Sequence, residues 1–231
     1  PCPRDITAAG GTMFTFADED GLTVMRAKGE GSHAAWPDGG GNAITGLLSL
    51  LCALPLADGP CKQALKDLNA LLPHGDYLGR ALGIAQEEPV AGPLTVAFTL
   101  LEVTDTGLEG RFDSRVPLCA TEENCLQVAK AAFEARGFTF EGEQDQPHHT
   151  PADSSFVQLL LQRYEEYSGL KGECLSTGGG TYVHDIPGGV AFGCTLPGFE
   201  PHAHGADERV RISDLMLSAK LFTHIIIDLC T

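Results

Sequence analysis

The densest group of side chains that could do chemistry lies in the loop 201–208, which reads PHAHGADE. It brings His202, His204, Asp207 and Glu208 close together in the sequence. Imidazole and carboxylate groups are the ligands that zinc and manganese take in proteins. The loop therefore indicates a metal site. The competing interpretation is a solvated loop with two surface histidines.

A second candidate is His33, in the glycine-rich segment 29–37 (GEGSHAAWP). The strand-like run 22–28 precedes this segment, and Asn42 is a good N-cap for the apolar helical run 43–54 that follows. A helix apolar on every face is usually buried. A histidine on a turn held between two regular elements is well placed for function. The alternative is a structural turn histidine whose ring only hydrogen-bonds to the backbone, because an isolated histidine carries little information.

Arg115 lies near the end of the strand-like run 108–116, in which apolar and charged residues alternate. The guanidinium fork of an arginine suits a carboxylate ligand. The alternative is a salt bridge to Asp113 or Glu109 on the charged face of the same sheet.

Gly178, Gly179 and Gly180 form a glycine turn within the segment 176–185 (STGGGTYVHD). Such a turn lets the backbone approach a ligand closely, and its N–H groups can form a nest for an anion. An ordinary tight turn is the alternative. The segment is not a dinucleotide-binding fingerprint, because the GxGxxG spacing and the following helix are both missing.

Composition excludes some classes of partner. The chain has 231 residues and a formal net charge of −16, which argues against nucleic acid, since phosphate binding needs clustered Lys and Arg. No apolar run approaches the roughly 18 residues of a membrane span, so we expect no membrane partner. The eight cysteines are scattered without a CxxC pair, which predicts reduced thiols and a cytoplasmic protein.

Hydrophobic periodicity predicts the elements that must position these residues. In chain order they are strands at 13–17 and 22–28 joined by the acidic hairpin turn 18–21, helices at 43–54 and 61–72, strands at 94–103 and 108–116, a helix between Thr121 and Gly137, and a short strand at 138–141. In the run 94–103, Val96, Phe98 and Leu100 alternate toward one side. This order predicts an α/β fold of the α+β kind, in which two helices cover an open antiparallel sheet.

The polar segment 142–151 lacks periodicity and is the predicted domain boundary. Beyond it we expect an amphipathic helix at 153–168, a short strand at 190–194 and a last helix capped by Ser213. Two helices with so little sheet resemble one edge of a larger α/β layer.

Together and in this order, these segments resemble the co-catalytic zinc peptidase family of bacterial dipeptidases, carboxypeptidase G, aminoacylases and acetylornithine or succinyl-diaminopimelate deacylases. The GGGTY sequence and the insertion around 73–77 are closest to the monomeric, peptidase V-like dipeptidase branch. The segments that carry the resemblance are 29–34 (GEGSHA) with Pro37 and 41–43 (GNA), 112–115 (FDSR), 178–182 (GGGTY), 190–193 (VAFG), His204 with Glu208, and 212–215 (ISDL).

The resemblance implies a ferredoxin-like lid domain at 1–150, with a helical insertion at about 57–90, and the C-terminal segment of an α/β catalytic domain at 151–231. It implies that His204 binds zinc, that His33 polarises the scissile carbonyl, and that Arg115 holds the substrate carboxylate with help from the backbone of Gly178, Gly179 and Gly180. The intact enzyme would bind two Zn²⁺ ions, with Mn²⁺ or Co²⁺ as alternatives.

Three departures from the family accompany the match. Glu30 stands where the family has Lys, and His202 and His184 have no counterpart. The family's HxD turn and Glu-Glu pair, which supply the other metal ligands and the general base, have no likeness here. We therefore expect the C-terminal part of an enzyme, inactive alone, whose partner is the missing N-terminal half or a second copy.

The expected function is zinc-dependent hydrolysis of dipeptides or short peptides with a free C-terminal carboxylate. The alternatives are an N-acyl amino acid deacylase and a non-catalytic lid or dimerisation module.

Overall fold

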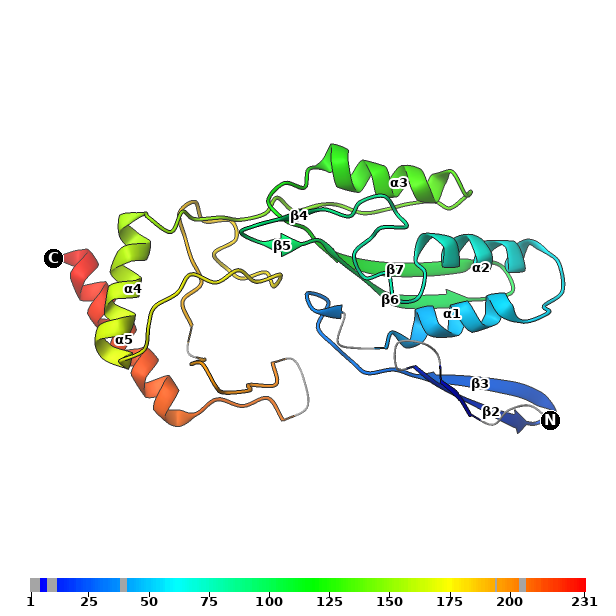
Figure 1. Ribbon diagram of the computed structural model, residues 1–231, viewed down its shortest axis with the longest axis horizontal. Coiled ribbons are helices and arrows are strands. Elements are labelled where there is room, and N and C mark those ends of the chain that lie inside the picture. Colours follow the sequence, from blue (N-terminus) through cyan, green and yellow to red (C-terminus); the bar gives the residue numbers. More distant parts are fainter. Residues whose placement is uncertain (1–4, 8–11, 38–40, 194, 204–206) are drawn as a thin grey trace. The chain divides into compact units, whose positions relative to one another are not determined.

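The structure is a computed structural model that describes residues 5–7, 12–37, 41–193, 195–203 and 207–231. It divides into two compact units (Figure 1). The first comprises Pro1–Pro147 together with Ser176–Gly179, and the second comprises His148–Leu175 together with Gly180–Thr231.

The first unit contains small antiparallel sheets and three α-helices. Its elements are β1 (Asp5–Thr7), β2 (Met13–Glu19), β3 (Leu22–Lys28), α1 (Ala43–Ala53), α2 (Pro60–Leu71), β4 (Glu87–Glu88), β5 (Gly92–Pro93), β6 (Thr95–Val103), β7 (Leu108–Arg115), the π-helical turn η2 (Glu122–Leu126) and α3 (Gln127–Glu134). The strands pair as β1-β2-β3, β4-β5 and β6-β7. The described residues therefore form three separate sheets, where the sequence predicted one open sheet.

The β2–β3 hairpin confirms the predicted acidic turn. Asp20 and Gly21 occupy its two central positions with φ of 54° and 79°. Two residues with positive φ are what the tightest hairpin turns need, and Asp-Gly is a favoured pair for them. The turn therefore sets the register that pairs Phe14 with Ala27 and buries the Phe14 ring.

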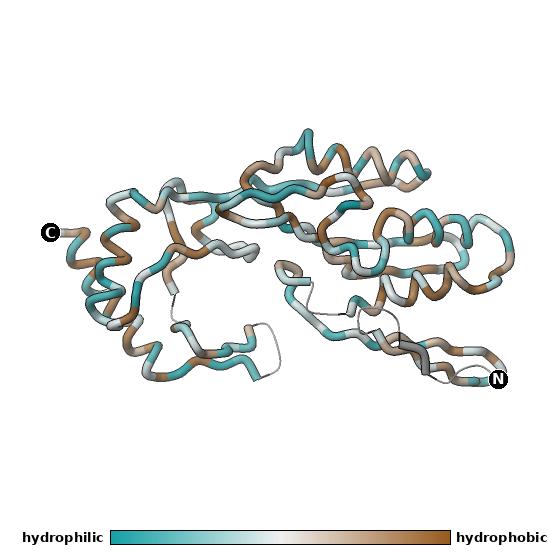
Figure 2. Tube along the Cα trace, viewed as in Figure 1, coloured by the Kyte–Doolittle hydropathy of each residue, from teal (hydrophilic) through white to brown (hydrophobic). Residues whose placement is uncertain are grey.

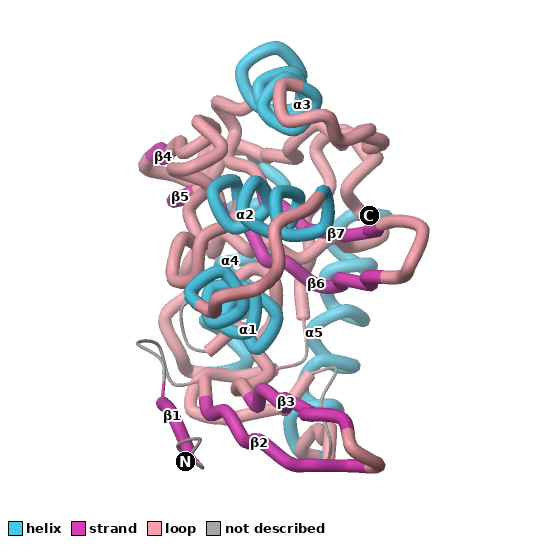
Figure 3. Tube along the Cα trace, turned by 90° about the vertical axis from the view of Figure 1, so that its right-hand side faces the viewer, coloured by secondary structure: helices cyan, strands magenta, loops and turns pink. Residues whose placement is uncertain are grey.

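Helix α1 begins as predicted at Asn42, whose side chain accepts a hydrogen bond from the Thr45 N–H at 3.0 Å. The Asn42 amide also donates to the Phe98 carbonyl of β6 at 2.8 Å, which fixes the helix start against that strand. The expectation that α1 is buried on every face is wrong, because only Thr45, Gly46 and Leu48 are buried. The helix lies beside β3, α2 and β6 (Figure 3). Its remaining residues are half-buried or exposed.

The β6–β7 pair carries one irregularity. Val96 and Phe98 are buried, but the register shifts between Phe98 and Leu100, and Leu100 is exposed. The predicted alternation of these three residues toward one side is therefore wrong at Leu100, since the bulge interrupts the two-residue period of the strand. Leu101 packs against the core instead.

The core of the first unit lies between these helices and β6. Phe133 of α3 stacks on Phe112 of β7 with ring centroids 5.7 Å apart, and Phe138 and Phe140 contact Phe133. The predicted strand at 138–141 is not formed, because this segment has no strand partner among the described residues and joins the core by its rings alone.

The second unit is built around α4 (Ser155–Ser168) and α5 (Ile212–Cys230). Ser154 caps the start of α4, and Gly169 ends it with a φ of 71°. Helix α5 begins at Ile212 with Arg211 as its N-cap, so the predicted cap at Ser213 is wrong. The Ser213 hydroxyl bonds the neighbouring Asp214 carboxylate instead.

Leu160, Leu221 and Ile225 form the small core of the second unit. The predicted strand at 190–194 is absent over 190–193, because this segment pairs with no other strand among the described residues. Phe192 contacts the rings of Tyr164 and Phe222 from this irregular segment. Within the described ranges, no helix combines the length and apolar character that crossing a membrane requires.

Candidate functional site

The structure places the predicted site residues in different parts of the chain. His33, Arg115, Gly178 and Gly179 belong to the first unit, whereas Gly180 belongs to the second. The predicted metal ligand His204 lies outside the described residues. The candidate site therefore consists of the predicted residues that lie together in the first unit.

Arg115 makes the salt bridge that competed with the carboxylate interpretation. Its Nε and Nη2 donate to the two oxygens of Asp113 at 2.7 and 2.8 Å, along β7. Its Nη1 donates to the Gly178 carbonyl at 2.8 Å. A guanidinium has five N–H groups, so these three bonds leave one N–H on each terminal nitrogen. The two interpretations are thus compatible, because Asp113 orients the fork that a ligand carboxylate would use.

Gly178 lies where a larger residue would not fit. A Cβ added to it would be 2.7 Å from the Ala35 Cβ and 3.4 Å from the Arg115 Cβ. The glycine therefore lets its segment approach both β7 and the turn that follows His33. The neighbouring Gly179 N–H donates to the Thr177 hydroxyl at 3.2 Å, so this amide has a partner within its own turn.

His33 is half-buried on the turn that connects β3 to α1. Its Nδ1 accepts a hydrogen bond from the Ala35 N–H at 3.1 Å, and its ring lies 5.3 Å from that of Trp36. An acceptor at Nδ1 fixes the neutral tautomer with its proton on Nε2. The geometry therefore makes Nε2 of His33 a hydrogen-bond donor.

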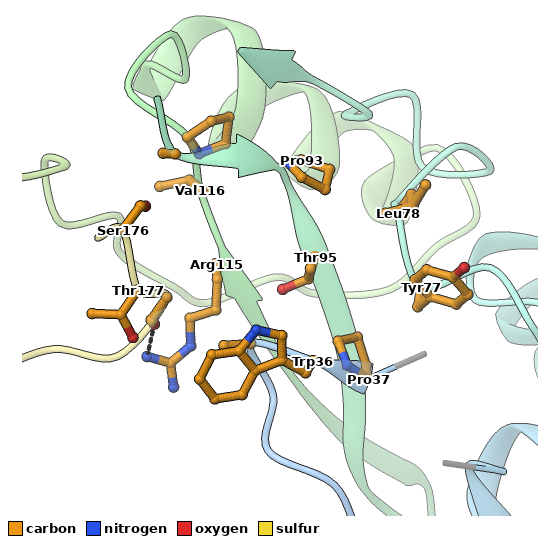
Figure 4. Close-up of a pocket in the computed structure, with 14 residues that line it drawn as sticks. Trp36, Pro37, Tyr77, Leu78, Pro93, Thr95, Arg115, Val116, Ser176 and Thr177 are labelled. Atoms are coloured by element: carbon orange, nitrogen blue, oxygen red, sulfur yellow. Dashed lines mark hydrogen bonds between the residues drawn. The ribbon is translucent and has the colours of Figure 1, made fainter. Parts of the chain in front are cut away.

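A pocket of about 230 Å³ adjoins Arg115, and no sequence motif predicts it. Segments far apart in the chain line it, including Trp36, Pro37, Tyr77, Leu78, Pro93 and Arg115 (Figure 4). The dashed line in Figure 4 is the bond from Arg115 to Gly178 at the edge of this pocket. No local pattern could predict the pocket, because it depends on tertiary contacts between these segments.

Hydrogen bonds hold the walls of the pocket in place. The Val96 N–H of β6 donates to the Tyr77 carbonyl at 2.8 Å. The carboxylate of Asp76 accepts from three backbone N–H groups of the same loop, those of Leu78, Arg80 and Ala81.

A further bond fixes a second wall. The Thr95 hydroxyl donates to the Ala34 carbonyl at 3.0 Å. The turn that carries Trp36 is thereby tied to β6.

The described residues do not supply a metal centre. They contain no group of three or more His, Cys, Asp or Glu side chains arranged to hold an ion. His202 has a φ of 52°, and its Nε2 lies 3.4 Å from Nη2 of Arg209. His184 lies beside His148, with ring centroids 6.0 Å apart. The predicted zinc site therefore depends on His204 and stays a prediction.

Comparison with known proteins finds relatives that are named as dipeptidases. No protein-family model matches the chain. It is 33% identical over 217 residues to "Putative dipeptidase YtjP" of Bacillus subtilis (strain 168), covering 92% of this chain and 45% of that protein. It is 30% identical over 218 residues to "Beta-Ala-Xaa dipeptidase" of Lactobacillus delbrueckii subsp. lactis, covering 94% of this chain and 45% of that protein. The chain thus spans about half the length of the curated relatives it matches.

Proposed function

We propose that this chain, which is related in sequence to bacterial dipeptidases, binds and polarises the substrate in a zinc-dependent dipeptidase. The substrate is a dipeptide or short peptide with a free C-terminal carboxylate. The observation that carries the proposal is Arg115, a guanidinium oriented by Asp113 at the edge of a pocket. In this proposal the first unit acts as the lid domain and the second as the C-terminal segment of the catalytic domain.

Arg115 would hold the carboxylate of the substrate. Its two remaining N–H groups lie on the terminal nitrogens, and its side chain is about one-third exposed. Asp113 neutralises part of the charge but keeps the fork in one orientation, so less conformational freedom is lost when a carboxylate binds. The contact to the Gly178 carbonyl fixes the position of the fork relative to the glycine turn.

His33 would donate a hydrogen bond from Nε2 to the scissile carbonyl. The bond from the Ala35 N–H to Nδ1 supports this role, because it leaves the proton on the nitrogen that must donate. A donor aimed at a carbonyl oxygen stabilises the negative charge that develops there as the tetrahedral intermediate forms.

We assign His204 to zinc in the intact enzyme, with Mn²⁺ or Co²⁺ as alternatives. A bound zinc pair supplies Lewis-acid polarisation and lowers the pKa of a bound water toward neutrality. The described residues contain no group of three or more His, Cys, Asp or Glu side chains that could hold an ion, so the chain alone is expected not to hydrolyse dipeptides.

The exposed apolar residues of α5 support the proposal of a protein partner, either the rest of the enzyme or a second copy of this chain. Ile212, Leu215, Met216, Ile226 and Ile227 are all at least half exposed on one helix. The described cysteines are all free thiols, which supports the proposal of a reducing, cytoplasmic setting.

The test is the kinetics of the intact enzyme on paired substrates. Arg115→Ala should raise KM for a dipeptide free acid and leave that for the dipeptide amide nearly unchanged, and Arg115→Lys should recover only part of the loss, because it lacks the fork. Equal effects on acid and amide would remove the proposed role of Arg115.

His33→Ala should lower kcat by roughly 100- to 1000-fold while bound metal is retained, because an oxyanion donor acts mainly in the transition state. Loss of metal in this variant would contradict the assignment. Turnover of N-acyl amino acids without turnover of dipeptides would favour a deacylase, and no turnover of either by the intact protein would favour a binding module.

A further inference from the structure

The pocket beside Arg115 has the size of one side chain. A cavity of roughly 150 Å³ takes up a benzene molecule, whereas pockets for whole drug-sized ligands run from roughly 300 to 1,000 Å³. At about 230 Å³ this pocket lies between the two. It can therefore hold one leucine- or phenylalanine-sized group but not a complete peptide.

The walls of the pocket are mainly apolar and carry no negative charge. Trp36, Pro37, Tyr77, Leu78 and Pro93 contribute rings and aliphatic groups. Thr95, Ser176 and Thr177 add hydroxyl groups, and none of the described residues that line the pocket is acidic. A lysine or arginine side chain would enter without a counter-charge, at a substantial desolvation cost. An apolar or aromatic side chain would replace water against these walls, which favours binding.

The position of the pocket relative to Arg115 decides which part of a substrate it would receive. In an amino acid, the carboxylate carbon and the side chain are both bonded to the same Cα. Arg115 is itself a lining residue. A carboxylate held by its guanidinium therefore leaves the side chain of the same residue within reach of the pocket.

From this geometry we infer that the pocket formed by Trp36, Pro37, Tyr77, Leu78 and Pro93 is a subsite for the side chain of the substrate's C-terminal residue. It selects apolar and aromatic side chains over glycine and over basic ones. Trp36 is a specificity-determining residue, since its side chain is more than half exposed in the free chain and has surface to bury on a ligand. This inference rests on the proposed function, because Arg115 must bind the carboxylate.

Trp36 also provides the measurement, because it is the only tryptophan of the chain. Titration of chain 1–231 with N-acetyl-leucine, N-acetylglycine, N-acetyl-leucinamide and Nα-acetyl-lysine can be followed by its fluorescence emission. An apolar group that covers the indole should shift the emission to shorter wavelength. N-acetyl-leucine should bind roughly 10- to 100-fold more tightly than N-acetylglycine, as expected for burial of a leucine side chain.

Matched variants separate the pocket from its surroundings. Ala91 lines the pocket and the adjacent Val90 does not. Ala91→Leu should fill the pocket and reduce the preference for N-acetyl-leucine over N-acetylglycine to within about twofold, while Val90→Leu should preserve it. Tyr77→Ala removes part of a wall instead of filling the pocket, and it should also weaken the preference for N-acetyl-leucine. This second variant keeps the test valid if Ala91→Leu fails to fold.

The two steps of the inference fail in different ways. Equal affinity for N-acetyl-leucine and N-acetylglycine, with the amide still binding more weakly than the acid, would overturn the subsite and leave the role of Arg115 intact. Equal affinity for N-acetyl-leucine and its amide would remove Arg115 as the carboxylate ligand and the subsite with it. Absence of any saturable change in Trp36 emission would also overturn the inference.

Discussion

The two units of this chain differ in how much apolar surface each one buries by itself. Fourteen described residues form the buried core of the first unit, from Leu48 to Phe133, whereas three form that of the second. In the second unit, α5 contains many hydrophobic residues (Figure 2), and several of them are exposed. Burial of apolar surface is the dominant favourable term in folding. The first unit therefore has its own source of stability, and the second has little.

The two units also differ in the interactions of their polar side chains. In the first unit, the Asp76 carboxylate accepts hydrogen bonds and the Thr95 hydroxyl donates one, and these bonds fix loops around one pocket. In the second, Arg163 of α4 joins the two helices through its bond to Asp228 of α5, and it also bonds Glu166 of its own helix. These carboxylates raise the pKa of the Arg163 guanidinium, first through the hydrogen bond to Asp228. Exposed pairs of this kind contribute little stability.

The largest loss of stability is expected for Phe98→Ala in the core of the first unit. Phe98 is 4% exposed and packs against Gly110 of the partner strand. Removing a buried phenylalanine ring costs about 3–5 kcal/mol. Urea unfolding followed by Trp36 emission measures the first unit alone, because the second has no tryptophan. The control is Leu100→Ala, two residues along β6 and exposed, which should lose well under half as much. Equal losses would contradict the assigned bulge.

In the second unit we expect Ile225→Ala to cost about 2–5 kcal/mol. With so small a core, this loss should melt the α4–α5 pair at 25 °C and reduce the helical circular dichroism signal. Ile226→Ala is a matched control, because Ile226 is the next residue of the same helix and is 58% exposed against 4% for Ile225. The Trp36 transition should not move in either variant. A shift of that transition with Ile225→Ala would mean that the two units unfold together.

A smaller effect is expected at the start of α1. Asn42→Ala removes both the helix cap and the bond to the Phe98 carbonyl, at about 1 kcal/mol each. Asn42→Asp keeps the cap acceptor and loses only the donor, so it should cost about half as much. Urea unfolding followed by Trp36 emission again measures both. If Asp and Ala are equally destabilising, the bond to β6 accounts for the whole effect.

Local signals predicted most of the elements of the first unit. Asp20-Gly21 marked the hairpin, Asn42 the start of α1, and Thr121 the start of the helical segment that includes η2 and α3. These predictions succeeded because a turn or a cap depends on a few neighbouring residues. The pairing of strands into separate sheets and the bulge after Phe98 could not be predicted, since they depend on partners distant in the sequence.

The candidate site divides in the same way. The partner of Arg115 was one of two predicted from its strand, because Asp113 lies two residues away on the same face. The contact of Arg115 with Gly178 spans 63 residues, and Tyr77 reaches the pocket through a loop with no sequence motif for binding. Their placement follows from tertiary contacts, so it needed the structure.

The last prediction has the smallest effect on stability and concerns the thiols. Cys125 is 4% exposed, and burial raises the pKa of its thiol, whereas Cys119, six residues earlier, is exposed. The attacking species is the thiolate, so both burial and a raised pKa slow alkylation. Iodoacetamide labelling at pH 8, followed by peptide mass spectrometry, should modify Cys119 at least about tenfold faster than Cys125.

The same labelling sharpens the comparison of the units. Cys174 and Cys230 of the second unit are exposed and should react at a rate close to that of Cys119. Because Cys125 lies in the core of the first unit, its labelling requires opening of that core. Phe98→Ala should therefore accelerate labelling of Cys125 and leave Cys174 and Cys230 unchanged. If Cys125 reacts as fast as Cys119 in the unsubstituted chain, the first unit opens as readily as its surface, and the contrast in stability between the two units fails.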